Sequence, residues 1–420
     1  MDQADERQGE GCSMQHLTTG MLLENQLLIC VARRSVDSVT ATQIAWLVQQ
    51  KLDWNYLLDS ANRHGLTQLL YRHLSSVRPE AAPKEIASKL KDEFLTNSRW
   101  AFFHTRELLR TIKVLENNGI SAVGFKGPIL SLAAYGDVAL RQAGDLDILI
   151  KKRDFRRATA LLDSEGYAID PQLTAAQLSS HLRFDCEISL VHQESGCVVD
   201  LHWGLAPKRF HFALNPGDFF QRLQTITLGN HTLRTFSNED LVVFLCMHGA
   251  KHLWVRLEWI SSLAELIRDS EGINWVTVVE NARRSHSLRR LLLGLMLAKD
   301  LRPDIQIPEQ VFTAVPNSES LQRCAEGVRE RIFQIRAPDK IEAFLFNLEV
   351  MDHKRNAIAG LFLFVLVPRI SDWQGAPLPD ALYPLYYLLR PLRLAAQFIS
   401  ALGKWIRSRK RFLMKSSPLP

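Results

Sequence analysis

The sequence predicts an α+β protein in which a mixed α/β core lies between two helical regions. Apolar residues recur every three or four positions over residues 1–95 and again after about residue 236, as in amphipathic helices. Between these regions, short apolar runs with a period of two are typical of strands. The 420 residues are 46% hydrophobic and 23% charged, a globular composition that excludes a disordered, collagen-like or disulfide-scaffold chain.

These changes of pattern divide the chain into four parts. Residues 1–95 form an N-terminal helical region, and residues 96–235 form the α/β core. A helical domain over residues 236–375 begins with the pattern Ser-x-x-Asp at Ser237, which is typical of a capped helix start. Residues 376–420 begin in a Pro-rich segment and continue as a basic amphipathic tail.

The core itself is expected to contain helices and short strands in close succession. The helices are expected over residues 97–119 and 153–166, each with a glycine at its C-terminal end. The strands are expected over residues 120–127, 146–150, 186–192 and 197–203, the last two as a hairpin around the sequence QESG.

Two aspartates mark the start of the second expected strand. Asp145 and Asp147 are two positions apart, so the period of a strand places both carboxylates on one face. Like charges held this close repel, and a cation between them removes the conflict. Mg²⁺ prefers oxygen ligands and typically takes one or two carboxylates together with phosphate oxygens. A lone Asp-x-Asp pair is more often solvated or capping, so the interpretation depends on the residues around it.

A third carboxylate, Asp200, lies on a later expected strand. Asp200 and His202 share one face of that strand, and apolar residues share the other. If this strand lies beside residues 146–150, Asp200 completes a three-carboxylate metal centre with Asp145 and Asp147. Such a centre activates an attacking hydroxyl and stabilises a leaving pyrophosphate.

A turn that is suited to an anion precedes the carboxylates. Lys126 and Gly127 lie between an expected strand and an expected helix, and Pro128 suits the first position of that helix. A helix start presents N–H groups to an anion, and Lys126 adds a positive charge beside it. Arg141 adds a guanidinium group that can grip phosphate.

This ordered combination resembles the nucleotidyltransferase superfamily typified by DNA polymerase β. More closely, it is similar to a bacterial branch of uncharacterised nucleotidyltransferase family proteins. The resemblance covers roughly residues 50–300 and is carried by the motifs FKGPIL, YGDVALRQAGDLDILI, VVDLHWGL and HGAKHLWVRLEW. The Lys-Gly pair stands where the wider superfamily usually has Gly-Ser or Gly-Gly.

The resemblance implies a polymerase β-like core with a small mixed sheet, and it implies a reaction. Asp145, Asp147 and Asp200 would bind Mg²⁺ or Mn²⁺. The enzyme would transfer a nucleoside monophosphate from an NTP, with ATP favoured, to the hydroxyl of a small molecule, glycan precursor or protein. Asp200 would act as general base or metal-assisted activator of that hydroxyl. The alternative is a catalytically silent nucleotide-binding or scaffolding protein on the same fold.

The motif HGAKHLWVRLEW allows two interpretations. His248 and His252 are four residues apart and therefore share one face of a helix. Packing around Trp254 and Trp259 explains this pattern without any ligand. The resemblance instead implies that His248, Lys251 and His252 contact substrate or phosphate.

The formal net charge of +6 is concentrated in the tail. Residues 381–420 contain eight basic and no acidic residues, which leaves the rest of the chain at −2. The tail suits an anionic membrane surface, RNA phosphates (less favoured) or packing on the body of the protein. The longest charge-free apolar run, residues 357–367, has 11 residues, whereas a bilayer span needs about 20. We therefore expect no membrane-spanning helix and a cytoplasmic protein, with the inner membrane face as a place where the tail could hold it.

Further patterns exclude other classes. The six cysteines are scattered without a Cys-x-x-Cys pair, which favours buried thiols in a reducing compartment over zinc or disulfide chemistry. The sequence also lacks the glycine-rich patterns of phosphate-loop ATPases, Rossmann proteins and α/β-hydrolases.

Overall fold

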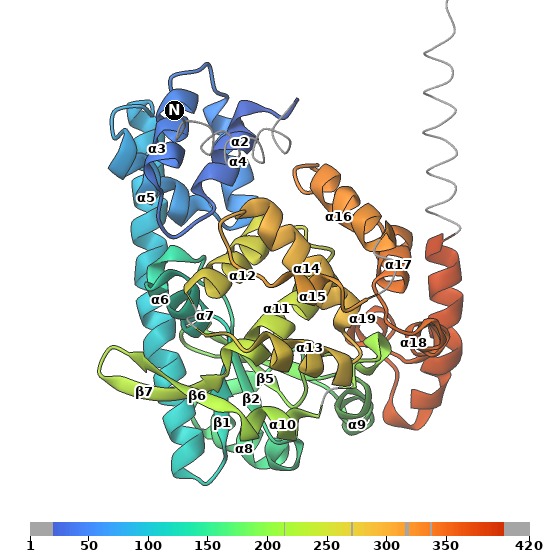
Figure 1. Ribbon diagram of the computed structural model, residues 1–420. Coiled ribbons are helices and arrows are strands. Elements are labelled where there is room, and N and C mark those ends of the chain that lie inside the picture. The colour runs from blue at the N-terminus through green and yellow to red at the C-terminus, as the bar shows by residue number, and fades with distance from the viewer. Residues whose placement is uncertain (1–19, 214, 270–271, 316–318, 337, 399–420) are drawn as a thin grey trace, which may run out of the picture.

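The computed structural model describes most of the chain (Figure 1). The described residues are 20–213, 215–269, 272–315, 319–336 and 338–398. Residues 399–420, which carry six of the eight basic residues of the tail, lie outside them, so the structure describes only the first part of the tail.

The described part of the N-terminal region, residues 20–95, is helical, as predicted. Its helices are α2 (Leu23–Val31), α3 (Ser38–Leu47), α4 (Trp54–His64) and α5 (Thr67–Val77). Asp37 and Asp53 start α3 and α4, since each side chain accepts a hydrogen bond from a backbone N–H of the first turn.

The long helix α6 (Lys84–Asn117) starts earlier than the predicted residue 97. Residues 84–96 are rich in good helix formers, which explains why the helix extends over them. The helix therefore crosses the division that we placed at residue 95, and it runs along the side of the molecule from the N-terminal helices to the sheet (Figure 1).

The core contains a mixed five-stranded sheet in the order β1-β2-β5-β4-β3. The strands are β1 (Ala122–Gly124), β2 (Leu146–Ile150), β3 (Tyr167–Ile169), β4 (Glu187–His192) and β5 (Val198–His202). Strands β2 and β5 are parallel, and the other neighbours are antiparallel. The predicted hairpin is formed by β4 and β5, and β2 matches its prediction. The edge strand β3 was not predicted.

The two faces of this sheet have different neighbours. Leu146, Ile148 and Ile150 are fully buried and form one hydrophobic cluster with residues of α6 and of α8 (Phe155–Ser164). On β5, Val199 and Leu201 point into the same cluster. The opposite face therefore carries Asp147 and Asp200, and it lies toward the helical domain.

Short elements connect the strands. They are α7 (Pro128–Tyr135), η1 (Val138–Leu140), η2 (Lys152–Asp154), α9 (Ala175–Phe184), η3 (Lys208–Phe210) and α10 (Pro216–Gln221). A second, unpredicted hairpin follows, with strands β6 (Leu223–Leu228) and β7 (His231–Phe236).

The helical domain begins as predicted at Ser237, whose side chain accepts a hydrogen bond from Asp240 N and caps α11. Its helices are α11 (Asn238–Lys251), α12 (Leu257–Asp269), α13 (Trp275–Arg284), α14 (Leu288–Leu301), α15 (Glu309–Phe312) and α16 (Glu319–Arg331). These helices share one hydrophobic cluster with the N-terminal helices.

The C-terminal elements are α17 (Lys340–Glu349), α18 (Lys354–Leu366), α19 (Ile370–Gly375) and η4 (Asp380–Leu385), and residues 386–398 are also helical. The stretch Arg355–Gly375 is long and apolar enough to cross a membrane by length and composition, with a mean hydropathy of 1.3 and 22% of it buried. We expected no membrane-spanning helix because we considered only the charge-free run 357–367, which is shorter than this stretch. However, this stretch includes Arg369 and Asp372, which are costly in hydrocarbon.

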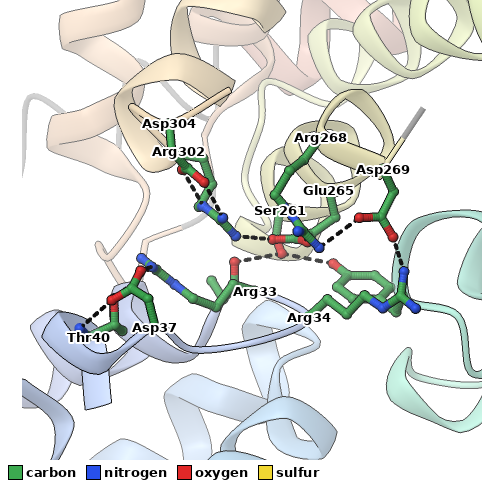
Figure 2. A network of polar contacts seen from close by, with 12 residues as sticks. Arg33, Arg34, Asp37, Thr40, Ser261, Glu265, Arg268, Asp269, Arg302 and Asp304 are labelled. Atoms are coloured by element: carbon green, nitrogen blue, oxygen red, sulfur yellow. Dashed lines mark hydrogen bonds and ion pairs between the residues drawn. The ribbon is translucent and has the colours of Figure 1, made fainter. Parts of the chain in front are cut away.

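A buried polar network joins the N-terminal helices to the helical domain (Figure 2). Ser261 of α12 donates a hydrogen bond to the carbonyl of Ala32, and its hydroxyl lies 2.8 Å from Tyr135 Oη of α7. Glu265 is fully buried and pairs with Arg268 at 3.0 Å and with Arg302. This network fixes α7, the helix that follows the Lys-Gly turn, against two other parts of the molecule.

Removal of the Glu265 carboxylate tests how much this network contributes to the stability of the fold. We expect Glu265→Ala to lower the free energy of unfolding by about 1.5–3 kcal/mol, because the buried Arg302 loses one charged partner and keeps Asp304. Urea unfolding provides the measurement. The matched control is Glu280→Ala, which breaks an exposed pair with Arg284 and should cost less than about 1 kcal/mol. Equal losses for both variants would contradict the structural role of the network.

Candidate active site

The parallel pairing of β2 with β5 brings two of the predicted carboxylates together. Asp147 lies directly opposite Asp200 in the register of these strands. His202, two residues further along β5, faces the same side. Oxygen atoms of the two carboxylates and a ring nitrogen of His202 all lie within 4.8 Å of one another. This donor set suits a divalent metal ion, since carboxylate oxygens and imidazole nitrogen are common ligands.

Asp147 is buried and has two close polar partners. Lys126 Nζ lies 2.6 Å from its Oδ1 atom, and His202 Nε2 lies 3.0 Å from the same oxygen. Burial alone would raise the pKa of Asp147, but the charge of Lys126 and the contact with His202 outweigh burial and hold this pKa well below its usual range. Asp147 is therefore ionised at neutral pH.

Asp200 behaves in the opposite way. Ser189 Oγ donates a hydrogen bond of 2.6 Å to its Oδ1 atom. Burial raises the pKa of Asp200, and the negative charges of Asp147 and Asp145 raise it further against the effect of Ser189. A raised pKa beside an ionised neighbour is the result expected when a nearby cation, here Lys126, pairs with only one of two clustered carboxylates. The electrostatics of the site thus favour a bound cation.

Asp145 stands at the edge of this group. We predicted that Asp145 and Asp147 would share one face at the start of the strand. The strand β2 begins at Leu146, as predicted, but the Asp145 side chain just before it is exposed. Asp145 belongs to neither of the two groups of possible metal ligands in the described part of the chain, which are Asp147, Asp200 and His202, and Cys186, Glu187 and His202. Although its side chain is exposed, desolvation by the surrounding protein and the charge of Asp147 raise the pKa of Asp145, so it still lies within electrostatic reach. The structure therefore brings two of the three predicted carboxylates together and leaves the third beside them.

The Lys-Gly turn lies directly beside the carboxylates. Gly127 has a φ of 55°, and a Cβ atom there would lie 3.2 Å from the backbone oxygen of Asp145. A side chain would therefore be strained by both conformation and space. Pro128 occupies the first turn of α7, as predicted. Glycine at this position lets the turn approach the residue that precedes β2.

Arg141 has a different partner from the predicted phosphate. Its Nη2 atom lies 2.8 Å from Glu258 Oε1, and both side chains are largely buried. Asn97 of α6 holds the same loop, because its side chain donates hydrogen bonds to the carbonyls of Ala139 and Arg141. The side-chain Oδ1 atom of Asn97 also accepts a hydrogen bond from Ala143 N. The loop that precedes Asp145 is therefore anchored to α6 through Asn97 and to α12 through Glu258.

The predicted histidine motif lies at the end of α11, near the same carboxylates. The rings of His248 and His252 are 4.7 Å apart, and both lie against Trp259 at 5.4 and 5.5 Å. Burial, with the nearby charges of Lys251 and Lys126, lowers the pKa of His252 to about 4. The pKa of His248 is also well below its usual value, mainly because of burial. Both rings are neutral at pH 7 and available as hydrogen-bonding groups.

Lys251 connects this motif to the sheet. Its Nζ atom lies 4.0 Å from Glu187 Oε1, and the other Glu187 oxygen lies 3.1 Å from His202 Nδ1. His202 therefore bridges Asp147 and Glu187. Trp254 is fully buried in the core, in agreement with a packing role.

We did not predict Glu187, Ser189 or Asn97 as site residues. The first two could have been found from the hairpin, since pairing outward from QESG places Ser189 opposite Asp200 and Glu187 opposite His202. The sequence carries no comparable signal for Asn97, because its contacts come from a loop 42 to 46 residues away.

Metal titration tests the carboxylate pair. We expect Mn²⁺ binding, measured by calorimetry on the full-length protein, to weaken at least about tenfold in Asp200→Asn, since one anionic ligand is lost. The control Asp163→Asn changes an exposed aspartate of α8 and should bind like the wild type.

The pH dependence of this binding has a defined sign. Mn²⁺ requires the ionised form of Asp200, whose pKa is raised. Affinity should therefore fall as the pH is lowered, beginning above the range of an ordinary aspartate. Equal affinity in Asp200→Asn and the wild type would remove Asp200 from the metal site.

Comparison with known proteins agrees with this geometry. A family model described as uncharacterised nucleotidyltransferase matches residues 50–303, a range that contains the whole five-stranded sheet, the Lys-Gly turn and the histidine motif. A search of the curated proteins gives no match. Because the matched range is more than half of the chain, this protein belongs to the uncharacterised nucleotidyltransferase family.

Proposed function

We propose that this protein is a Mg²⁺-dependent nucleotidyltransferase that moves a nucleoside monophosphate from an NTP, with ATP favoured, to a hydroxyl group. Family membership supports nucleotidyl transfer in general. The single observation that supports the finer proposal is the position of Asp147 opposite Asp200, with Lys126 Nζ 2.6 Å from Asp147. Phosphoryl chemistry depends mainly on positioning and on charge neutralisation, which this arrangement offers.

The residues that would hold the metal are Asp147 and Asp200, with Asp145 beside them. Mg²⁺ or Mn²⁺ would there neutralise the charge that develops on the triphosphate. Lys126 supplies a positive charge of the protein itself at the same place. The positive end of the α7 helix dipole begins at the adjacent Gly127 and favours phosphate groups.

Asp200 is the best candidate for the general base. Its raised pKa brings its basicity closer to neutral pH than that of Asp147. In the proposed step, the acceptor oxygen forms a bond to the α-phosphorus while the bond from that phosphorus to the bridging oxygen breaks. Pyrophosphate leaves, and Asp200 takes the proton of the acceptor hydroxyl. Ser189 holds the carboxylate in place through its hydrogen bond.

One contact favours the alternative of a catalytically silent nucleotide-binding or scaffolding protein. Lys126 already neutralises Asp147 through a direct ion pair, so the buried carboxylate has a partner without any metal. In addition, the turn lacks the serine that many relatives in the wider superfamily place there. Under this alternative the protein would bind an NTP but transfer nothing.

A labelling experiment separates the two functions. Purified full-length protein is incubated with each NTP labelled at the α-phosphate, Mg²⁺ or Mn²⁺, and a lysate of the source cells including its membranes. We expect a labelled acceptor with the wild type, and a loss of at least about 100-fold in rate with Asp200→Asn. Asp147→Asn should also lose the activity.

The control Asp163→Asn should label the acceptor at the wild-type rate. Transfer that survives both Asp147→Asn and Asp200→Asn would exclude the mechanism. If the protein binds a nucleotide but labels no acceptor in the lysate or its membranes, the silent alternative is favoured.

We also propose a cytoplasmic location with association at an anionic membrane surface through residues 381–420. In the described part of this tail, Arg390 is buried and pairs with Asp372, and Tyr386 is buried as well. This first part therefore packs on the body of the protein. Of the eight basic residues of the tail, Arg390 and Arg393 are described. The other six lie in residues 399–420, outside the described chain.

A further inference from the structure

A cavity of about 360 Å³ lies between η3 and the C-terminal elements, next to the candidate active site. Its size falls in the usual range for small-molecule sites. Lys251 forms part of its wall, and the same Lys251 lies 4.0 Å from Glu187. Since Glu187 contacts His202 and His202 contacts Asp147, a short series of contacts leads from the cavity to the carboxylates.

Positive charge is in excess around this cavity. Besides Lys251, four arginines contribute to its wall, namely Arg209, Arg369, Arg390 and Arg393. Within the described residues, Asp372 pairs with Arg390 and Arg393, and Asp185 pairs with Arg209.

Among the basic residues of the cavity wall, Arg369 has the clearest physical reason to bind an anion. Its Nη2 atom is buried without a hydrogen-bond partner in the part of the chain that the structure describes. Burial, together with the charges of Arg209 and Arg390, lowers the pKa of Arg369 to about 9. An anionic ligand would remove both costs, and the planar guanidinium group binds phosphate, like carboxylate, through two parallel hydrogen bonds.

The rest of the wall is apolar. The apolar side chains that line the cavity include Phe210, Phe344, Leu348, Leu361, Phe364 and Leu394. Free phosphate or a sugar phosphate has no hydrocarbon to bury against this surface. A hydrocarbon chain, in contrast, gains about 0.8 kcal/mol of binding free energy for each buried CH₂ group. The cavity therefore suits a molecule with a charged head and an apolar tail.

Exposed apolar residues continue this surface to the outside. Leu361 lines the cavity and is also 41% exposed. Its neighbours Ile358 and Phe362 on α18, and Leu388 and Leu392 on the last described helix, are more than 60% exposed. Figure 1 shows these helices side by side at one edge of the molecule, away from α6. Large exposed apolar patches of this kind mark membrane or ligand contacts.

We propose that this cavity binds the acceptor, and that the acceptor is a lipid whose head group carries both a phosphate and a free hydroxyl. The arginines hold the phosphate, the apolar wall holds the hydrocarbon chain, and the hydroxyl lies toward Lys251 and Asp200. This inference rests on the proposed function and adds the substrate class. The transfer itself is unchanged. The oxygen of the lipid hydroxyl forms a bond to the α-phosphorus of the NTP, which gives a phosphodiester, while pyrophosphate leaves and Asp200 takes the proton.

Three soluble probes test the ligand class by calorimetry on the full-length protein. They are dihexanoyl phosphatidylglycerol, glycerol phosphate as the head group alone, and dihexanoylglycerol as the uncharged lipid. We expect the first to bind at least about tenfold more tightly than either of the others, because only it uses both parts of the cavity. Equal binding of glycerol phosphate would show a site for free phosphate and overturn the lipid assignment.

Two neighbouring alanines of α18 offer a matched pair of variants. Ala357 lines the cavity, whereas Ala359 is exposed and lies outside the lining residues. Ala357→Trp should fill the cavity and weaken phosphatidylglycerol binding at least about tenfold, while Ala359→Trp should leave it unchanged. Arg369→Gln, with its fold checked by circular dichroism, should show the same loss if Ala357→Trp fails to fold. Unchanged binding in the cavity variants would overturn the inference.

The outcomes distinguish this inference from the proposed function. Phosphatidylglycerol binding that depends on Ala357, without nucleotidyl transfer to any acceptor, would refute the function and keep the cavity as a lipid site. Transfer to a cell acceptor at the wild-type rate in Ala357→Trp would refute the cavity as the acceptor site and keep the function.

Discussion

The pairing of β2 with β5 is the constraint on which the rest of the site depends. It places the carboxylates of Asp147 and Asp200 side by side on the face of the sheet opposite to the α6 and α8 cluster. The pairing is held in register by Leu146, Ile148 and Ile150, which are buried against α6 and α8. A shift of one residue would turn these side chains out of the core and Asp147 into it, so packing energy protects the geometry of the site.

Two carboxylates at this depth require compensation, and the surrounding elements supply it unequally. Asp147 has Lys126 and His202, while Asp200 accepts a hydrogen bond from the hydroxyl of Ser189. The result is one strongly acidic and one weakly acidic carboxyl group in contact. The buried network around Ser261 and Glu265 supports this arrangement at a distance, because it fixes α7 behind the Lys-Gly turn (Figure 2).

The sequence was sufficient for those parts of the fold that local patterns determine. The strand Leu146–Ile150, the hairpin of β4 and β5 and the cap at Ser237 follow from alternation, turn residues and capping chemistry. The parallel neighbour of Asp147 followed from the family resemblance. The pair of Arg141 with Glu258 joins residues far apart in sequence, and β3 has only three residues, so neither left a local signal. Asp145 was expected to share a face with Asp147, but periodicity does not fix the direction of a side chain that precedes the first residue of the strand.

The central claim is that Asp147 and Asp200 form one cation site in which Lys126 is a replaceable partner. Anomalous diffraction from crystals of the full-length protein with Mn²⁺ and a non-hydrolysable NTP tests it most directly. The account predicts a manganese peak within about 2.5 Å of oxygens from both carboxylates, with the Lys126 ammonium moved from Asp147 toward phosphate. An intact ion pair between Lys126 and Asp147, with manganese absent from both carboxylates, would contradict it.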